Sequence, residues 1–314
     1  MSPKSPLNAK STLVDPELMA RVRQIQIRTH RLVNTALAGG YRSTFRGQGV
    51  EFEEVRPYLP GDDVRSIDWN VTARTGEPYI KNYSEERELT LQLLVDTSLS
   101  MDFGSRHWTK REAAAQIAGL ISYVAVQHQD RVGLTLFGEE PGLHLDARKG
   151  SKHILRVVRE VIAAKPTHGG SDLKTMLEQV ARTLHRRSLV FLISDFLVDE
   201  DENPWAEPLA RLASRHDVIA VRVIDPLEEE LPKSGKLTMR ELETGRMVAV
   251  DAGSHAVREE WRARARARLD KLIDVLSRSR VDLINLPIHV PKGEFADALV
   301  DFFRRRQAQH GGHK

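Results

Sequence analysis

The stretch LTLQLLVDTSLSMDFG, residues 89–104, decides the fold because it reads as a buried strand that runs into a polar turn. Its first half is almost continuously apolar: Leu89, Leu91, Leu93, Leu94 and Val95. This pattern is typical of a parallel strand covered on both faces. Asp96 follows where the strand ends, and Ser98 and Ser100 come after it at a spacing of two. Ligands of open α/β sheets bind outside the carboxyl ends of strands, so we expect these three side chains to line a site.

Downstream of this stretch, strand and helix patterns alternate up to residue 307. We expect further buried strands over 131–137, 188–194, 217–223 and 281–288, with helices between them, including 110–127 and 254–279. Residues 143–147 follow a strand too closely for a crossover helix, so they should pair antiparallel at the sheet edge. An insert at 231–251 has the pattern of a β-hairpin turning at Thr244-Gly245. The alternation over 89–307 predicts a doubly wound α/β fold with a mostly parallel sheet.

Upstream, the sequence divides into an arm and an N-terminal part, 15–88. Residues 1–14 are rich in Ser, Pro and Lys and should form a mobile arm, and residues 308–314 a tail. Pro16 and apolar residues at helical spacing predict a helix from residue 15 to near Gly39. Residues 41–88 have no long period and suggest a small irregular β-rich subdomain. Either Arg–carboxylate pairs hold it with Tyr58 and Trp69 packed beneath, or it is a partner-docking face.

Composition excludes several classes of protein. The chain has 314 residues, 40% hydrophobic and 29% charged, which is ordinary for a globular protein. A net charge of +3 is too small to indicate a nucleic-acid-binding protein. The absence of cysteine excludes disulfides and thiolate metal sites. No apolar run approaches the roughly 18 residues that a membrane-spanning helix needs, and the first residues lack a signal-peptide core. We therefore expect a cytoplasmic protein without a membrane span.

Three loops should meet at the carboxyl edge of the sheet: 96–100, 167–172 and 194–195. They carry hydroxyls and carboxylates, the oxygen ligands of hard cations such as Mg²⁺. The candidate metal ligands are Asp96, Ser98, Ser100, Ser171 and Asp195. The two aspartates are expected to act mainly through metal-bound waters, and a carboxylate from a partner would complete the shell. An aspartate at a strand end is also a common helix N-cap, and for Asp96 that alternative stays open.

At these residues the sequence resembles the metal-ion-dependent adhesion site (MIDAS) of von Willebrand factor A domains. Its Asp-x-Ser-x-Ser, later Thr and later Asp match Asp96, Ser98, Ser100, Ser171 and Asp195. Serine at 171 departs from the pattern and leaves open whether Thr167 takes that role. The resemblance implies a von Willebrand A-like fold and Mg²⁺, or Mn²⁺, as the bound ion.

The upstream segment is similar to the bacterial domain of unknown function 58 family. The residues that carry this resemblance are Gly49-Val50-Glu51-Phe52, Arg56-Pro57-Tyr58, Pro60-Gly61-Asp62-Asp63, Arg65, Ile67-Asp68-Trp69 and Ala73-Arg74. Membership implies frequent pairing with MoxR-type AAA+ ATPases and no known activity. The sequence therefore favours a Mg²⁺-dependent protein-interaction module that is not an enzyme. The alternative is a metal-dependent hydrolase, a PIN-like nuclease or phosphoesterase, with Asp102 as a further acid.

Overall fold

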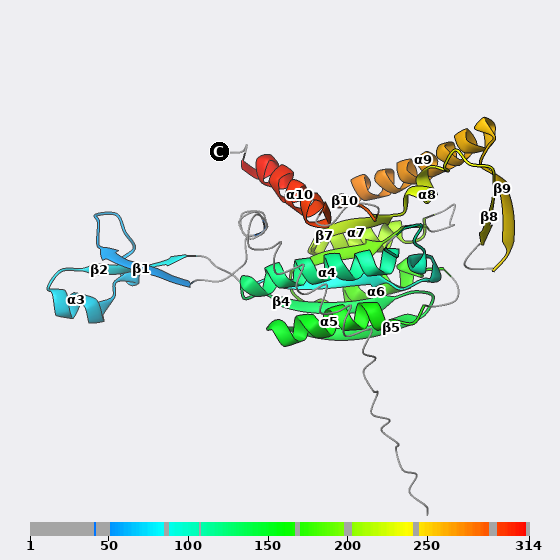
Figure 1. Cartoon of the computed structure of the whole chain (residues 1–314). Coiled ribbons are helices and arrows are strands. Elements are labelled where there is room, and N and C mark those ends of the chain that lie inside the picture. The colour runs from blue at the N-terminus through cyan, green and yellow to red at the C-terminus, as the bar shows by residue number, and fades with distance from the viewer. Residues whose placement is uncertain are drawn as a thin grey trace, which may run out of the picture.

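The computed structural model describes residues 41, 51–84, 88–106, 108–166, 170–197, 203–240, 245–288 and 294–311. The expected arm (1–14) and N-terminal helix (15–39) lie outside these residues, as does Thr167. In the described part, a six-stranded sheet forms the centre of the molecule (Figure 1). Its order is β10 (Asp282–Pro287), β7 (Asp217–Ile224), β6 (Leu189–Ser194), β3 (Thr90–Asp96), β4 (Arg131–Phe137) and β5 (Pro141–Arg148).

The sheet is parallel except for β5, which pairs antiparallel with β4 at one edge. The predicted α/β class, the mostly parallel sheet and the antiparallel edge strand are confirmed. The strand β3 lies at the centre, between β4 and β6. From β3 the chain moves outward through β4 and β5, then returns to β6 on the other side. The carboxyl ends of β3 and β6 therefore flank a topological switch point, where such sheets bind ligands.

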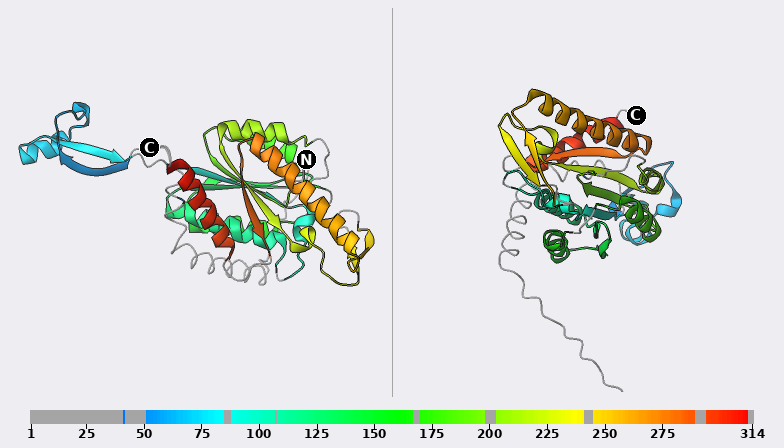
Figure 2. Two further views of the ribbon diagram at one scale, coloured as in Figure 1. Left: turned by 90° about the horizontal axis from the view of Figure 1, so that it is seen from above. Right: turned by 90° about the vertical axis from the view of Figure 1, so that its right-hand side faces the viewer.

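Helices cover both faces of the sheet (Figure 2). One face packs against α4 (Lys110–Gln127), α5 (Ser151–Ala163) and α10 (Glu294–Gly311), and the other against α6 (Leu173–Thr183), α7 (Ala206–Arg215) and α9 (His255–Arg278). Side chains alternate along β3, so Leu91, Leu93 and Val95 join the first core and Leu94 joins the second. Both faces of β3 are buried, which explains its nearly continuous apolar sequence.

The helix α4 begins and ends where the sequence predicts. Its N-cap, Thr109, accepts a hydrogen bond from the Glu112 N–H (3.2 Å), and the Glu112 carboxylate accepts one from the Thr109 N–H (3.0 Å). This capping box fixes the first turn of the helix. The backbone N–H of Lys110 also donates to the Phe103 carbonyl (2.8 Å), which ties the turn after β3 to the helix.

The N-terminal part contains more regular structure than expected. The strands β1 (Glu51–Pro57) and β2 (Tyr79–Ser84) pair antiparallel, and the 3-10 helix η2 (Val64–Ser66) and α3 (Trp69–Thr75) connect them. In Figure 1 this unit lies to one side of the main sheet. The expected Arg–carboxylate pairing is present, since Arg56 holds Asp62 through two bonds of 2.8 Å.

The expectation that Trp69 packs beneath this unit is wrong, because its side chain is 68% exposed. Trp69 is the first residue of α3, which Asp68 caps by accepting from the N–H groups of Asn70 and Val71. The two-stranded sheet offers too little surface to cover a large aromatic ring there. Ile80, at 5% exposure, is buried instead.

The insert is the predicted hairpin. The short helix α8 (Pro226–Glu229) leads into β8 (Lys236–Arg240) and β9 (Met247–Asp251), which pair antiparallel. Gly245 has φ +70°, a backbone conformation that suits glycine at the predicted turn. At the end of the chain, α10 runs to Gly311, beyond the expected boundary at 307, so part of the predicted tail is helical. No helix in the described ranges has the length and apolar character that crossing a membrane requires.

Candidate cation site at the carboxyl edge of the sheet

Asp96 stands at the end of β3, beside the switch point, with 0% of its surface exposed. The Ser98 N–H donates to Asp96 Oδ1 (2.8 Å), so the carboxylate closes the turn that leads into the 3-10 helix η3 (Leu99–Asp102). Asp96 is therefore not a helix N-cap; Thr109 caps α4. Asp96 is buried and hydroxyl groups cover it directly, while its action through metal-bound waters stays a prediction.

Two serines donate to Asp96: Ser194 at the end of β6, and Ser171 in the loop between α5 and α6. The Ser171 hydroxyl lies 2.7 Å from both carboxylate oxygens, and the Ser194 hydroxyl lies 2.6 Å from Oδ2. Ser171 is placed by its neighbour Asp172, whose N–H donates to the Gly138 carbonyl (2.9 Å) after β4. Ser194 was not predicted as a ligand although it is the last residue of β6. Its hydroxyl also accepts from the Phe196 N–H (3.0 Å).

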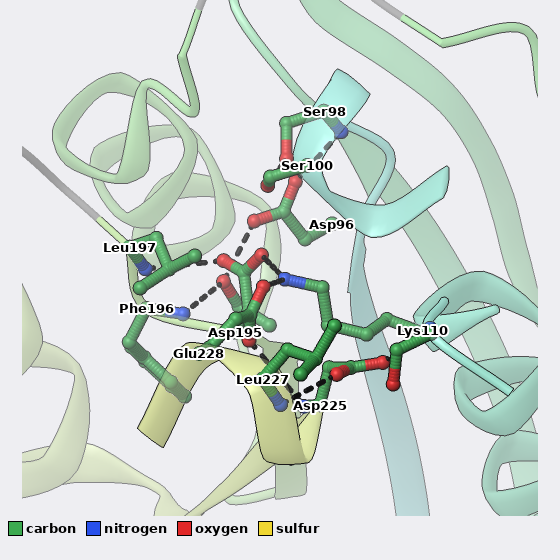
Figure 3. Close-up of polar contacts among 12 residues, drawn as sticks. Asp96, Ser98, Ser100, Lys110, Asp195, Phe196, Leu197, Asp225, Leu227 and Glu228 are labelled. Carbon is green, nitrogen blue, oxygen red and sulfur yellow. Dashed lines mark hydrogen bonds and ion pairs between the residues drawn. The ribbon is translucent and has the colours of Figure 1, made fainter. Parts of the chain in front are cut away.

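The remaining predicted residues complete the cluster (Figure 3). The hydroxyls of Ser98 and Ser100 lie 3.0 Å apart, and Ser100 is near enough to Asp195 to help lower the pKa of that carboxyl. Asp195 also accepts from the Leu197 N–H (3.1 Å). The structure thus brings together all five predicted residues, Asp96, Ser98, Ser100, Ser171 and Asp195. Whether they hold a metal stays a prediction.

Sequence reasoning missed a cation in this cluster. The Lys110 ammonium lies 2.5 Å from Asp195 Oδ2 and also pairs with Glu228 of α8, and the Lys110 side chain is 0% exposed. Lys110 is the first residue of α4, where the helix dipole disfavours a positive charge. A lysine in that position was the available signal that an anion lies nearby. Glu228 gives no comparable signal, because acidic residues are common in the first turn of a helix.

Burial and neighbouring charges shift the pKa of each ionisable group. Burial raises the pKa of Asp96 and the nearby Asp195 carboxylate raises it further, against the three hydrogen bonds that favour the charged form. Burial alone would raise the pKa of Asp195, but the Lys110 ammonium outweighs it and the net shift is downward. Burial opposes the charge on Lys110, while Asp195 and Glu228 raise its pKa overall. Burial raises the pKa of Glu228 despite Lys110.

Residues 54–271 match the family described as "Protein of unknown function DUF58". The chain belongs to this family. A relative similar along nearly its whole length is the uncharacterized protein Rv1480 of Mycobacterium tuberculosis, 30% identical over 98% of this chain and 96% of its own. A second relative is the uncharacterized protein MAV169 of Mycobacterium avium, 35% identical over 33% of this chain and 61% of its own.

Solved structures similar to this DUF58 chain include a conserved hypothetical protein BatB from Bacteroides thetaiotaomicron. It has 13% identity and a TM-score of 0.44, over 70% of this chain and 99% of that one. The VWA domain of SpRpn10 has 16% identity and a TM-score of 0.39, over 68% and 94% of the two chains. Both likenesses are distant and add nothing to the functional argument.

The donor set in this DUF58 chain fits a hard divalent cation. Every predicted ligand offers oxygen, and the cluster holds three carboxylates, Asp96, Asp195 and Glu228, against the single ammonium of Lys110. Burial disfavours the charged forms of Asp96 and Glu228, and a divalent cation nearby would favour them. In the described part of the chain no group of three or more His, Asp or Glu side chains could hold a metal alone. A bound ion would therefore depend on the serine hydroxyls and on an outside ligand.

Proposed function

We propose that this DUF58 protein is a Mg²⁺-dependent protein-binding module. The ion, Mg²⁺ or Mn²⁺, would be held by Asp96, Ser98, Ser100, Ser171 and Asp195, and an acidic residue of a partner protein would complete its shell. In this proposal the protein is not an enzyme, and it acts in the cytoplasm. One observation carries it: two buried carboxylates and three hydroxyls, from the loops after β3 and β6 and from the loop before α6, converge at the switch point of the sheet.

Each group has a distinct part in this proposal. The bound ion would supply a positive charge that attracts a carboxylate. Ser171 and Ser194 orient the Asp96 carboxylate by donating to it, and the Ser98 N–H holds Oδ1. Few anionic ligands on the protein leave the ion with charge for the partner, so metal and partner should strengthen each other's binding by the same factor.

The first partner to test is a MoxR-type AAA+ ATPase, chosen because of the family resemblance. The exposed side chains of Leu59, Val64 and Trp69 on the N-terminal unit support a role in protein binding. Large apolar side chains gathered on a small unit are typical of contact surfaces, and tryptophan is enriched among the residues that dominate binding energy.

The test is capture of a MoxR-type ATPase from the same bacterium by the immobilised chain, with Mg²⁺ or with EDTA. We expect EDTA, Asp96→Asn and Ser98→Ala each to weaken binding by about 5- to 150-fold, the range of ordinary coupling between sites. Ser122→Ala is the matched control, because that serine is buried in α4 and its hydroxyl donates only to the Ala118 carbonyl (2.6 Å). Affinity that ignores EDTA and both site variants would refute the proposal.

A metal-dependent hydrolase would need further acids around the site. The candidate Asp102 instead forms an ion pair with Arg111 of α4. Steady-state hydrolysis of a nucleic acid or a phosphomonoester, abolished by Asp96→Asn and kept in Ser122→Ala, would nevertheless make that function the better one.

A further inference from the structure

The Lys110 ammonium joins two parts of the molecule. Its side chain is 0% exposed and lies between Asp195, 3% exposed, and Glu228, 18% exposed. Asp195 belongs to the strand-end cluster, whereas Glu228 belongs to α8, which leads into the hairpin β8–β9. The capping box of α4 and the Lys110 N–H bond to Phe103 fix the base of this side chain, so only the flexible stem and its charge can move.

Asp195 is shared between Lys110 and the predicted metal site. Its Oδ2 accepts from the ammonium at 2.5 Å, and its Oδ1 accepts from the Leu197 N–H at 3.1 Å. Ser100, a predicted ligand, lies near the same carboxylate and helps to lower its pKa. A divalent ion beside Ser100 and Asp195 would therefore lie close to a buried ammonium, and like charges at short range in a buried place repel strongly.

Glu228 already pairs with the ammonium and can hold it when it leaves Asp195. In Figure 3 the Asp195 carboxylate lies between Asp96 and Glu228, so a cation near Asp96 repels the ammonium toward Glu228. The helix α8 is well anchored to receive it. The Asp225 side chain accepts from the N–H groups of Leu227 (2.8 Å) and Ser105 (2.6 Å), and the Trp261 indole N–H donates to the Leu227 carbonyl (2.9 Å).

We propose that Lys110 is a resident cation that a divalent metal displaces from Asp195, and that Glu228 receives the displaced ammonium. Metal binding thereby strengthens the ion pair between Lys110 and Glu228. The stronger pair stabilises α8, which leads into the β8–β9 hairpin. This inference rests on the proposed metal site and assigns its regulation. Lys110 and Glu228 act here as positioning residues and not as metal ligands.

The test combines calorimetric Mn²⁺ titration with hydrogen exchange of the peptide spanning residues 225–234. Lys110→Met should bind Mn²⁺ at least about tenfold tighter than wild type, because the competitor is gone. Glu228→Gln should bind about tenfold weaker, because the ammonium then has only Asp195 as an anionic partner. Changes to outer-shell partners of a metal are commonly worth factors of this size. Mn²⁺ should slow exchange in the 225–234 peptide of wild type and leave it unchanged in both variants, with β5 as the internal reference.

The outcomes separate this inference from the proposed function. If wild type binds Mn²⁺ and Lys110→Met binds no tighter, the inference is overturned while the metal site stands. If only Lys110→Met binds, the ammonium excludes the metal from the native protein, and both the displacement and the proposed Mg²⁺ dependence are overturned. If neither binds, both fail.

Lys110→Met leaves buried carboxylates unpaired and can fail to fold. The double variant Lys110→Met/Glu228→Gln removes one charge of each sign and provides a second comparison. It must bind Mn²⁺ tighter than Glu228→Gln alone, since the two differ only in the ammonium. Equal affinities of these two variants would overturn the inference.

Discussion

Replacing Ser194 with alanine tests the hydrogen-bond network beneath the candidate site. The Ser194 hydroxyl donates to Asp96 Oδ2 at 2.6 Å and accepts from the Phe196 N–H at 3.0 Å. Ser194 is 1% exposed, so neither partner would regain water without local rearrangement. The change removes one small polar atom and no apolar packing, which makes the hydrogen bonds the main quantity measured.

The expected loss follows from these two bonds. A hydrogen bond to a charged group contributes about 1.5–3 kcal/mol, and a buried donor left without an acceptor costs about 1–3 kcal/mol. Partial relaxation around the smaller side chain lowers the sum, so we expect Ser194→Ala to reduce the free energy of unfolding by about 3 kcal/mol. The pKa of Asp96 should also rise further, because the Ser194 bond lowers it in the native protein.

Urea unfolding of both proteins at pH 8, followed by circular dichroism, measures this loss. Ser122→Ala is again the matched control, since its hydroxyl donates to a carbonyl within its own helix, and we expect it to change stability by less than about 1 kcal/mol. A loss of the same small size in Ser194→Ala would refute the reasoning, because the network would then carry no energy beyond that of an ordinary buried serine.

Three further predictions concern other parts of the chain. Burial raises the pKa of Asp130 from 3.8 to about 6, so the folded protein keeps a proton that the unfolded chain has released, and stability should fall as pH rises from about 4 to about 6. Asp130→Asn should flatten that slope in urea unfolding at several pH values; identical slopes would contradict the assignment. Trp69→Ala should change the melting temperature little, because the ring is 68% exposed, yet weaken capture of the partner ATPase; a large loss of stability would show that the ring is packed. Arg56→Lys should speed proteolysis near residues 59–62, because lysine cannot replace both bonds to Asp62, while equal cleavage rates would show that the pair does not hold the loop.

Local sequence signals predicted most of the fold. The apolar runs of β3, β6 and β7 and the glycine turn at Gly245 each specify an element through short-range physics. The close spacing of β4 and β5 correctly predicted an antiparallel edge, because no crossover helix fits between them. The N-terminal unit was harder to predict, since its short strands carry little periodicity and its Trp69 looks like a core residue although it is 68% exposed.

The sequence by itself determined which strand-end loops carry oxygen ligands, and therefore that Asp96, Ser98, Ser100, Ser171 and Asp195 would meet at one edge of the sheet. The shared direction of the parallel strands predicts this, because their carboxyl ends lie at one edge of the sheet. Only the tertiary structure decided that Asp96 is buried under serine hydroxyls and that Lys110 and Glu228 join the cluster. Those contacts connect residues as far apart as 110 and 228. The packing of α4 and α8 around the strand ends creates them, and no local pattern specifies it.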